Sequence, residues 1–216
     1  IQSDGKSKYK AISNKYFEYE KGLYERLIKL RHKMNKSKDL KKFENELKSL
    51  EKEITILHAK VVNNITSIFN IDIDLVGFHG QTIFHNATEK ITLQLGDGKL
   101  LSQLTKKKVV YDFRKNDLKN GGEGAPLTPI FHQMLEKKFN IKPVSFINIG
   151  GILNRTTILD NGELSAKDEG PGMCLIDKWI RANSKKKYDE NGDIARSGNV
   201  DKTILDQYID SLVVTN

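Results

Sequence analysis

The segment FINIGGILNRTTILDNGELSAKDEGPG, from Phe146 to Gly172, carries the clearest structural signals in this chain. An apolar run meets the pair Gly150-Gly151, resumes as a second extended run and turns at Asn161-Gly162. Asn-Gly between two extended runs is a strong hairpin signal. A lone carboxylate, Asp168, then precedes Gly170-Pro171-Gly172. We predict strand, close turn, strand and hairpin, followed by an acidic side chain on a Gly-rich corner that opens a helix.

The residue types in this segment suit phosphate and proton chemistry. Glycines let a backbone approach a ligand without interference from a Cβ, and a carboxylate near such a turn can accept a proton. A plainer interpretation also fits, in which Gly150-Gly151 is only a turn and Asp168 only caps the following helix. Both interpretations stay open at this point.

Outside this segment, short extended runs alternate with amphipathic runs and Gly-rich turns. This alternation predicts an α/β fold. The predicted strands cover residues 74–78, 91–95 and 109–111. The predicted helices cover residues 128–139, 173–182 and 200–213. Residues 100–105 are expected to form a short helix or a turn, and residues 188–199 a polar loop.

The N-terminal third has a helical pattern. Apolar side chains recur at three- and four-residue spacing over residues 8–34, and a longer seam of the same kind runs from Leu40 to Ile68. A polar break separates the two, and Ser37 or Asp39 could cap the second helix. We predict a long antiparallel helical hairpin over residues 8–69, packed on the domain that follows.

Composition places the chain among ordinary globular proteins. Its 216 residues carry a net charge of +8, and the excess lies in residues 1–69, with 16 Lys and Arg against 9 Asp and Glu. Because acids are interleaved with these bases, we expect a solvated face and no nucleic-acid partner.

No apolar run reaches the roughly 18 residues of a membrane helix, so we expect no membrane partner. A single cysteine, Cys174, fits a reducing compartment and a cytoplasmic protein. The first residue, Ile1, is not methionine, so we also expect a piece of a longer protein.

Several common site motifs are absent from the sequence. It has no G-x-x-x-x-G-K-[ST] phosphate loop and no G-x-G-x-x-G dinucleotide motif after a strand. His79 and His85 lack a third ligand at a suitable spacing, and residues 189–200 lack the Gly and Glu of a calcium loop. We therefore expect no metal site built by the protein alone.

Two further polar clusters accompany the Gly-rich segment. His79-Gly80-Gln81-Thr82 follows a predicted strand and offers donors and acceptors that suit a sugar, or hydrogen bonds within its own loop. Arg114 follows the strand predicted at 109–111. It could grip a carboxylate or phosphate, or form a salt bridge to Asp112 or Asp117. Together the clusters predict a phosphotransferase that acts on a hydroxylated small molecule.

A series of longer motifs follows in a fixed order between about residues 60 and 212. They read GFHGQTIFH, TLQLGD, VVYDFRKND, GGEGAPLTPIFH, NIGGILNRT, DEGPGMCLIDKWI and YDENGDIARSGNVD. This order resembles that of the anhydro-N-acetylmuramic acid kinases. The resemblance implies ribonuclease H-like domains of the sugar kinase, Hsp70 and actin type. Residues 1–110, including the helical hairpin, would be the C-terminal part of the first kinase lobe, and residues 111–216 the N-terminal part of the second.

The resemblance also implies an activity and its partners. Members of this family use ATP and Mg²⁺ to open the 1,6-anhydro ring of anhydro-N-acetylmuramic acid with water and to phosphorylate O6. The product, N-acetylmuramic acid 6-phosphate, belongs to cell-wall recycling and amino-sugar metabolism. The resemblance further implies a homodimer.

The family's site residues carry over position by position. Its catalytic aspartate, in a D-T-G-P-G-N block, falls on Asp168, which would deprotonate the attacking water. Gly150, Gly151 and Asn154 match the second phosphate motif, whose backbone N–H groups meet the nucleotide phosphates. Arg114 would face the lactyl carboxylate of the sugar. The positions expected to line the sugar pocket are Gln81, Thr82 and Arg114.

The sequence departs from the family pattern in four respects. Glu169 stands in place of Thr, Met173 in place of Asn and Glu123 in place of Gln, and the first phosphate motif, G-T-S-x-D-G, is absent. If Glu169 pointed towards Asp168, like-charge repulsion would disfavour the ionisation of one of the two acids. We expect little turnover from this chain alone. The departures leave an alternative, a divergent non-catalytic protein that binds sugar or uses its helical hairpin to contact partners.

Overall fold

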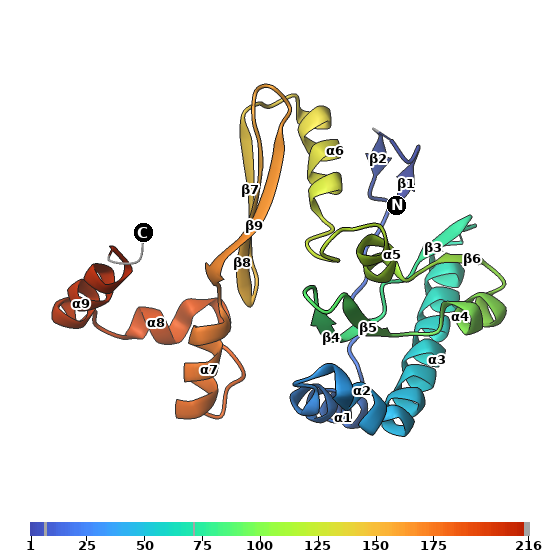
Figure 1. The fold of residues 1–216 in the computed structure, drawn as a ribbon, viewed down its shortest axis with the longest axis horizontal. Coiled ribbons are helices and arrows are strands. Elements are labelled where there is room, and N and C mark those ends of the chain that lie inside the picture. Colours follow the sequence, from blue (N-terminus) through green and yellow to red (C-terminus); the bar gives the residue numbers. More distant parts are fainter. Residues whose placement is uncertain (7, 71, 214–216) are drawn as a thin grey trace. The chain divides into compact units, whose positions relative to one another are not determined.

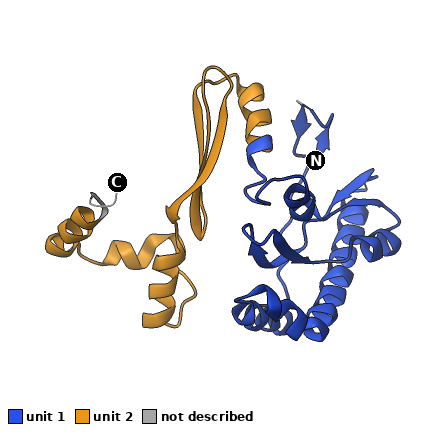
Figure 2. Cartoon of the chain, in the orientation of Figure 1, with its two compact units in different colours: residues 1–130 blue, residues 131–216 orange. Residues whose placement is uncertain are grey.

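The protein was analysed as a computed structural model that describes residues 1–6, 8–70 and 72–213 (Figure 1). The chain forms two compact units, residues 1–130 and 131–216 (Figure 2). Both contain helices and strands, so the mixed α/β class expected from the sequence is confirmed. Residues 111–130, which the resemblance assigns to the second kinase lobe, group with the first unit, and the assignment of kinase lobes stays a prediction.

The first unit begins with two short strands and three helices. Strands β1 (Gln2–Ser3) and β2 (Tyr9–Lys10) pair antiparallel. Helices α1 (Lys21–Lys33), α2 (Ser37–Lys42) and α3 (Glu44–Phe69) follow. The helix expected from residue 8 therefore begins only at Lys21.

A side-chain turn stands just before β2, where the start of the helix was expected. The carboxylate of Asp4 accepts hydrogen bonds from the backbone N–H groups of Lys6 and Lys8, both at 2.9 Å. Such bonds offer the backbone an alternative to a helix, and here they close the turn between β1 and β2.

The long helix expected from Leu40 is interrupted at Phe43. This residue has φ −108° and ψ 22°, outside the helical region, and its ring packs against the core of the unit. Tertiary packing thus overrides the continuous apolar pattern at this point. Neither Ser37 nor Asp39 is the N-cap of α2, which is Lys36. Asp39 lies in the first turn of this helix, and its Oδ2 accepts the N–H groups of Asn35 (3.1 Å) and Lys36 (2.9 Å).

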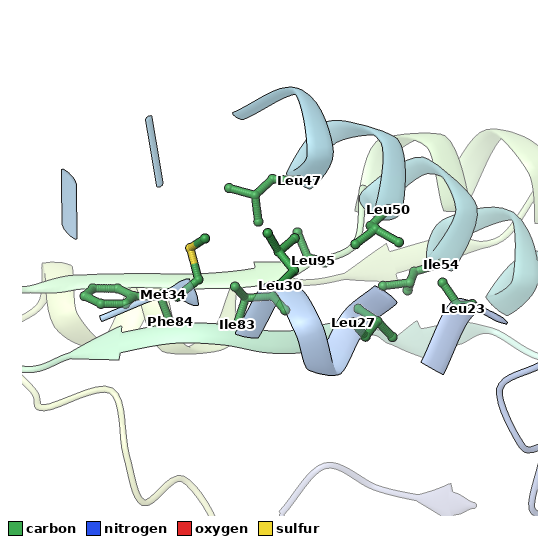
Figure 3. Packing of buried hydrophobic residues seen from close by; sticks show 10 residues of the cluster. All are labelled: Leu23, Leu27, Leu30, Met34, Leu47, Leu50, Ile54, Ile83, Phe84 and Leu95. Carbon is green, nitrogen blue, oxygen red and sulfur yellow. The ribbon is translucent and has the colours of Figure 1, made fainter. Parts of the chain in front are cut away.

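The main core of the first unit lies where α1 and α3 pack against β4 (Gln81–Asn86) and β5 (Ile91–Leu95) (Figure 3). Ile54, a member of this cluster, is fully buried. The apolar seam predicted along α3 supplies three of its members. The cluster consists of Leu23, Leu27, Leu30, Met34, Leu47, Leu50, Ile54, Ile83, Phe84 and Leu95.

A parallel pair of strands in the first unit leads into the two polar clusters, the one at His79 and the one at Arg114. Strand β3 (Leu75–Gly77) pairs parallel with β6 (Lys108–Val110), and the chain between them forms the β4–β5 hairpin and α4 (Gly98–Thr105). Helix α5 (Phe113–Lys119) follows β6 directly. The three predicted strands and the helix at 100–105 are confirmed, whereas β4 was not predicted.

The second unit is built on a three-stranded antiparallel sheet. Its strands lie in the order β7 (Val144–Ile149), β8 (Ile152–Ile158) and β9 (Leu164–Pro171), as the Phe146–Gly172 segment predicts. Helix α6 (Pro129–Phe139) crosses the boundary between the units. It contacts the sheet through His132, whose ring stacks on Phe146 with centroids 4.6 Å apart.

Three helices follow the sheet, namely α7 (Cys174–Asn183), α8 (Asp193–Ser197) and α9 (Lys202–Val213). The loop expected at 188–199 is thus partly helical, because both carboxylate oxygens of Asp189 accept N–H groups at the start of α8. Within the described ranges, no helix has both the length and the apolar character that a membrane crossing requires.

Candidate functional site

The Gly150-Gly151 turn joins β7 to β8 and holds the start of α7. The carbonyl of Gly150 accepts the N–H of Met173 (2.8 Å), and that of Gly151 accepts the N–H groups of Gly172 (3.0 Å) and Cys174 (3.3 Å). These bonds satisfy N–H groups that a helix leaves without partners at its start. The helix predicted just after Gly172 is therefore confirmed, whereas Asp168, expected on the Gly-rich corner, lies within β9.

The chain's own packing requires glycine at Gly172 but not at the turn. A Cβ on Gly172 would overlap the carbonyl oxygen of Gly150. A Cβ on Gly150 would come no closer than 3.6 Å to another atom, and one on Gly151 no closer than 4.0 Å, which is ordinary contact. The backbone of the turn is thus open to a ligand.

This difference predicts opposite outcomes for two alanine substitutions. Gly172→Ala should lower the free energy of unfolding by about 1–3 kcal/mol, because backbone atoms must move to admit the methyl group. Gly151→Ala should change it by less than about 1 kcal/mol in either direction. Urea unfolding of the two variants measures both values. Equal destabilisation would contradict the assignment of Gly151 as an open position.

Asp168 lies on β9 directly opposite Asn154 on β8. Directly opposed residues of an antiparallel pair point to the same face of the sheet, so these two side chains share a face. Asp168 is exposed. Helix α7 has no side-chain cap and its first flanking residue is Met173, so the alternative that Asp168 caps this helix is wrong. Asn154 is three residues from Gly151, or about 10 Å along the strand.

Glu169 pairs with cations and not with Asp168, and it stands at a β-bulge of β9. Leu153 pairs with Gly170 and Asn154 with Asp168, so Glu169 is the extra residue of β9. Its carboxylate accepts a hydrogen bond from Arg155 Nε (2.6 Å) and lies 3.2 Å from Lys167 Nζ. Arg155 and Lys167 form the opposed pair next to Asn154 and Asp168. Because successive side chains of a strand alternate between faces, this pair lies on the face opposite to Asp168. The carboxylate of Glu169, which stands where the family has Thr, is therefore paired with the two cations Arg155 and Lys167.

The hydrogen bond from Arg155, reinforced by Lys167, lowers the pKa of Glu169 from its ordinary value of 4.5. A lowered pKa in the folded state means that the charged pair stabilises the protein above pH 4.5 and that this contribution is lost as the pH falls through the folded-state pKa. Glu169→Gln should therefore be less stable than the parent at neutral pH, and the difference should shrink in acid. Urea unfolding at several pH values measures it. A difference that stayed constant into acid would contradict the pairing.

In the first unit, Arg114 on α5 links two segments that are distant in sequence. Its Nε donates to His79 Nε2 (2.9 Å), and its Nη1 donates to the carbonyl oxygen of Gly124 (2.7 Å). Burial lowers the pKa of Arg114, although a guanidinium stays protonated in proteins. The structure thus joins the His79 cluster, Arg114 and the Gly-rich loop in one arrangement.

The salt bridge considered for Arg114 is not formed. Asp112 pairs instead with Lys115 at 2.9 Å. Asp117 accepts the N–H of Gly124 at 2.7 Å, so α5 holds both backbone polar groups of Gly124, with Arg114 at the carbonyl and Asp117 at the N–H.

Sequence reasoning did not single out His79 or Asp117 as members of this arrangement. For Asp117 a signal existed, because it lies three residues after Arg114 on a short helix just before a Gly-rich loop, and that spacing puts both side chains on one face. For His79 no local signal existed, since its partner is 35 residues away.

Gln81 and Thr82 open β4, opposite Leu95 and Gln94 of β5. Both are half-buried, and Thr82 Oγ1 accepts a hydrogen bond from the buried Gln94 Nε2 at 3.4 Å. The structure places Gln81 and Thr82 in the same unit as Arg114 and shows no hydrogen bond between them and Arg114 among the described residues.

The described part of the chain holds no group of three or more His, Cys, Asp and Glu side chains arranged for a metal ion. Mg²⁺ usually binds through one or two carboxylates together with substrate phosphates and water. An exposed carboxylate such as Asp168, on the same sheet as the open Gly150-Gly151 turn, fits that mode better than a protein cage.

Comparison with known proteins gives consistent matches. The family model for anhydro-N-acetylmuramic acid kinase matches residues 2–213. The chain is 50% identical over 214 residues to the anhydro-N-acetylmuramic acid kinase of Pelagibacter ubique (strain HTCC1062), covering 98% of this chain and 57% of that protein. It is 37% identical over 217 residues to the protein of that name from Agrobacterium fabrum (strain C58), covering 98% of this chain and 58% of the relative. The chain thus spans somewhat more than half the length of these relatives.

Proposed function

The chain belongs to the anhydro-N-acetylmuramic acid kinase family, and we propose that it works as part of an ATP-dependent kinase with that activity. The reaction opens the 1,6-anhydro ring of anhydro-N-acetylmuramic acid with water and phosphorylates O6, which yields N-acetylmuramic acid 6-phosphate. We place this activity in peptidoglycan recycling in the cytoplasm, in a homodimer without nucleic-acid or membrane partners. The matches to named kinases support this activity over a non-catalytic role.

Asp168 is the proposed general base. It would take a proton from water as the water oxygen bonds to the anomeric carbon and the bond from that carbon to O6 breaks. The released O6 then attacks the γ-phosphate of ATP, and ADP leaves. The observation that carries this assignment is an exposed carboxylate about 10 Å along the same ribbon from an open Gly turn. The ion pair between Glu169 and Arg155 supports it, because a second free carboxylate would repel the phosphates.

Gly150, Gly151 and Asn154 are the proposed phosphate-binding residues. The two glycines leave room for a phosphate against the backbone, whose N–H groups are natural anion partners. Asn154 shares the face of Asp168, so its amide can hydrogen-bond a ligand that reaches from the turn to the base. Mg²⁺ would enter with the ATP phosphates and neutralise their charge during transfer.

Arg114, Gln81 and Thr82 are the proposed sugar-binding residues. Arg114 is a half-buried cation already fixed by His79 and Gly124, and a guanidinium can bind a carboxylate through two parallel hydrogen bonds. We assign it to the lactyl carboxylate. The amide of Gln81 and the hydroxyl of Thr82 would bind sugar hydroxyl or acetamido groups.

We further propose that the two units belong to ribonuclease H-like lobes of the sugar kinase type, and that α1 and α3 form an antiparallel hairpin. Two ion pairs support the hairpin. Arg26 pairs with Glu53 (2.6 Å) and Lys33 with Glu46 (3.5 Å). The later residue of α1 thus pairs with the earlier residue of α3, as expected for antiparallel helices.

The activity can be tested with the full-length protein, ATP, Mg²⁺ and anhydro-N-acetylmuramic acid in water labelled with a heavy oxygen isotope. We expect sugar phosphate carrying the label on the anomeric hydroxyl, detected by mass spectrometry, with one ADP per product. Label in free phosphate, or no phosphorylated sugar under any condition, would refute the proposal. A reaction with the already opened N-acetylmuramic acid serves as the control for ring opening.

A further inference from the structure

His79 is presented from a rigid part of the first unit. The preceding residue, Phe78, is 4% exposed, and its N–H donates to the carbonyl of Val110 (2.8 Å). The following residue, Gly80, has φ +71°, and a Cβ there would collide with the carbonyl oxygen of Leu95. The backbone on both sides of His79 is therefore held, while its own side chain is exposed.

The hydrogen bonds of His79 define its tautomer. A guanidinium N–H can only donate, so His79 Nε2 must accept the bond from Arg114 Nε. The proton of the neutral ring therefore lies on Nδ1, which donates to the carbonyl oxygen of Gly80 at 2.8 Å. The ring is fixed at both nitrogens and offers Arg114 an uncharged acceptor.

The charge of Arg114 is not cancelled by its neighbours. Its two partners are an imidazole nitrogen and a backbone carbonyl oxygen, both neutral. The nearby acids are engaged elsewhere, Asp112 with Lys115 and Asp117 with the N–H of Gly124. Across the described residues, no carboxylate lies within ion-pair distance of this guanidinium.

We propose that His79 is a positioning residue that orients Arg114 through a neutral hydrogen-bond acceptor and so leaves the guanidinium's full charge for an anionic group of the substrate. A carboxylate in place of His79 would orient Arg114 equally well, but it would neutralise the cation and occupy the donors that a ligand needs. The identification of the anion as the sugar's lactyl carboxylate rests on the proposed function.

The test compares three substitutions in the full-length protein. His79→Gln supplies a neutral acceptor, His79→Glu a charged one and His79→Leu none. We expect the KM of His79→Gln for the sugar to stay close to that of the parent. The other two variants should raise this KM on the order of ten-fold or more. The KM for ATP should change little in all three. Equal KM values for His79→Gln and His79→Glu would overturn the proposal, and this pair decides it even if His79→Leu fails to fold.

A substrate analogue with the lactyl carboxylate converted to an amide provides the matched control. The penalty of His79→Glu relative to His79→Gln should be lost with this neutral analogue, because no anion then competes with the new carboxylate. A penalty that persisted would mean that His79→Glu acts through the fold instead.

The tautomer offers a readout that does not depend on the reaction. Nitrogen NMR of the histidine-labelled protein at neutral pH should show Nδ1 protonated and Nε2 unprotonated at His79, and Arg114→Gln should alter the Nε2 resonance. A ring protonated at Nε2 would overturn the positioning geometry. If the parent does not turn over the sugar, the proposed function fails, while this measurement still decides whether His79 holds Arg114.

Discussion

Replacing Asp168 by asparagine is expected to lower kcat on the order of 10²–10⁴-fold, the usual contribution of a positioned general base. Asparagine keeps the shape of the side chain but cannot take the proton of the attacking water. The sugar-binding residues proposed in the first unit are untouched, so sugar binding should stay detectable. Steady-state kinetics of the full-length protein, with sugar binding followed by calorimetry, measures both effects.

Asp160→Asn is the matched control for this prediction. It makes the same chemical change in an exposed residue at the hairpin turn between β8 and β9, and it should leave kcat within about two-fold of the parent, as expected for a surface change away from the site. Retained activity in Asp168→Asn would refute the assignment of Asp168 as the base. Loss of activity in both variants would point to a general effect of charge on the ribbon.

Replacing Ile54 by alanine is expected to lower the free energy of unfolding by about 2–5 kcal/mol. Ile54 is 0% exposed and belongs to the cluster that joins α1, α3, β4 and β5 (Figure 3), so the removed methyl and methylene groups leave a cavity. A large part of the first unit's stability depends on this cluster. The shift of the urea midpoint at constant slope, followed by circular dichroism, measures the loss.

Ile68→Ala on the same helix is the control, because it removes the same atoms from a side chain that is 51% exposed. Its effect should stay within about 0.5 kcal/mol. Similar losses in the two variants would contradict the position of the core derived from the buried cluster.

Local patterns predicted most of the regular structure. The apolar runs and the Asn161-Gly162 turn located β7, β8 and β9, because side-chain alternation and a turn that needs positive φ are local properties of the sequence. The apolar seam placed Ile54 in the core for the same reason. Some predictions failed where a side chain bonds a nearby backbone, as Asp4 and Asp189 do, since such bonds compete with the pattern on which the predictions depended. The long helix failed at Phe43 for another reason, the packing of its ring against the core.

The candidate site was predicted in part. The motifs alone named Asp168, Arg114 and the Gly150-Gly151 turn as chemistry-bearing, and their assignment to a family needed no coordinates. The partners of these residues were not predictable in the same way. The sequence pattern shows neither the one-residue bulge at Glu169 nor the pairing of Glu169 with Arg155, because both depend on how β8 and β9 align.

The sequence by itself determined the class of fold, the seam of α3, the strand–turn–strand order around Gly150-Gly151 and the identity of the residues proposed for chemistry. Only the tertiary structure decided that Arg114 binds His79 and Gly124 instead of a neighbouring acid, and that Glu169 pairs with Arg155. The reason is physical. Strand and helix periodicity are written in adjacent residues, whereas the partner of a charged side chain depends on which distant segments the packed core brings within hydrogen-bond distance.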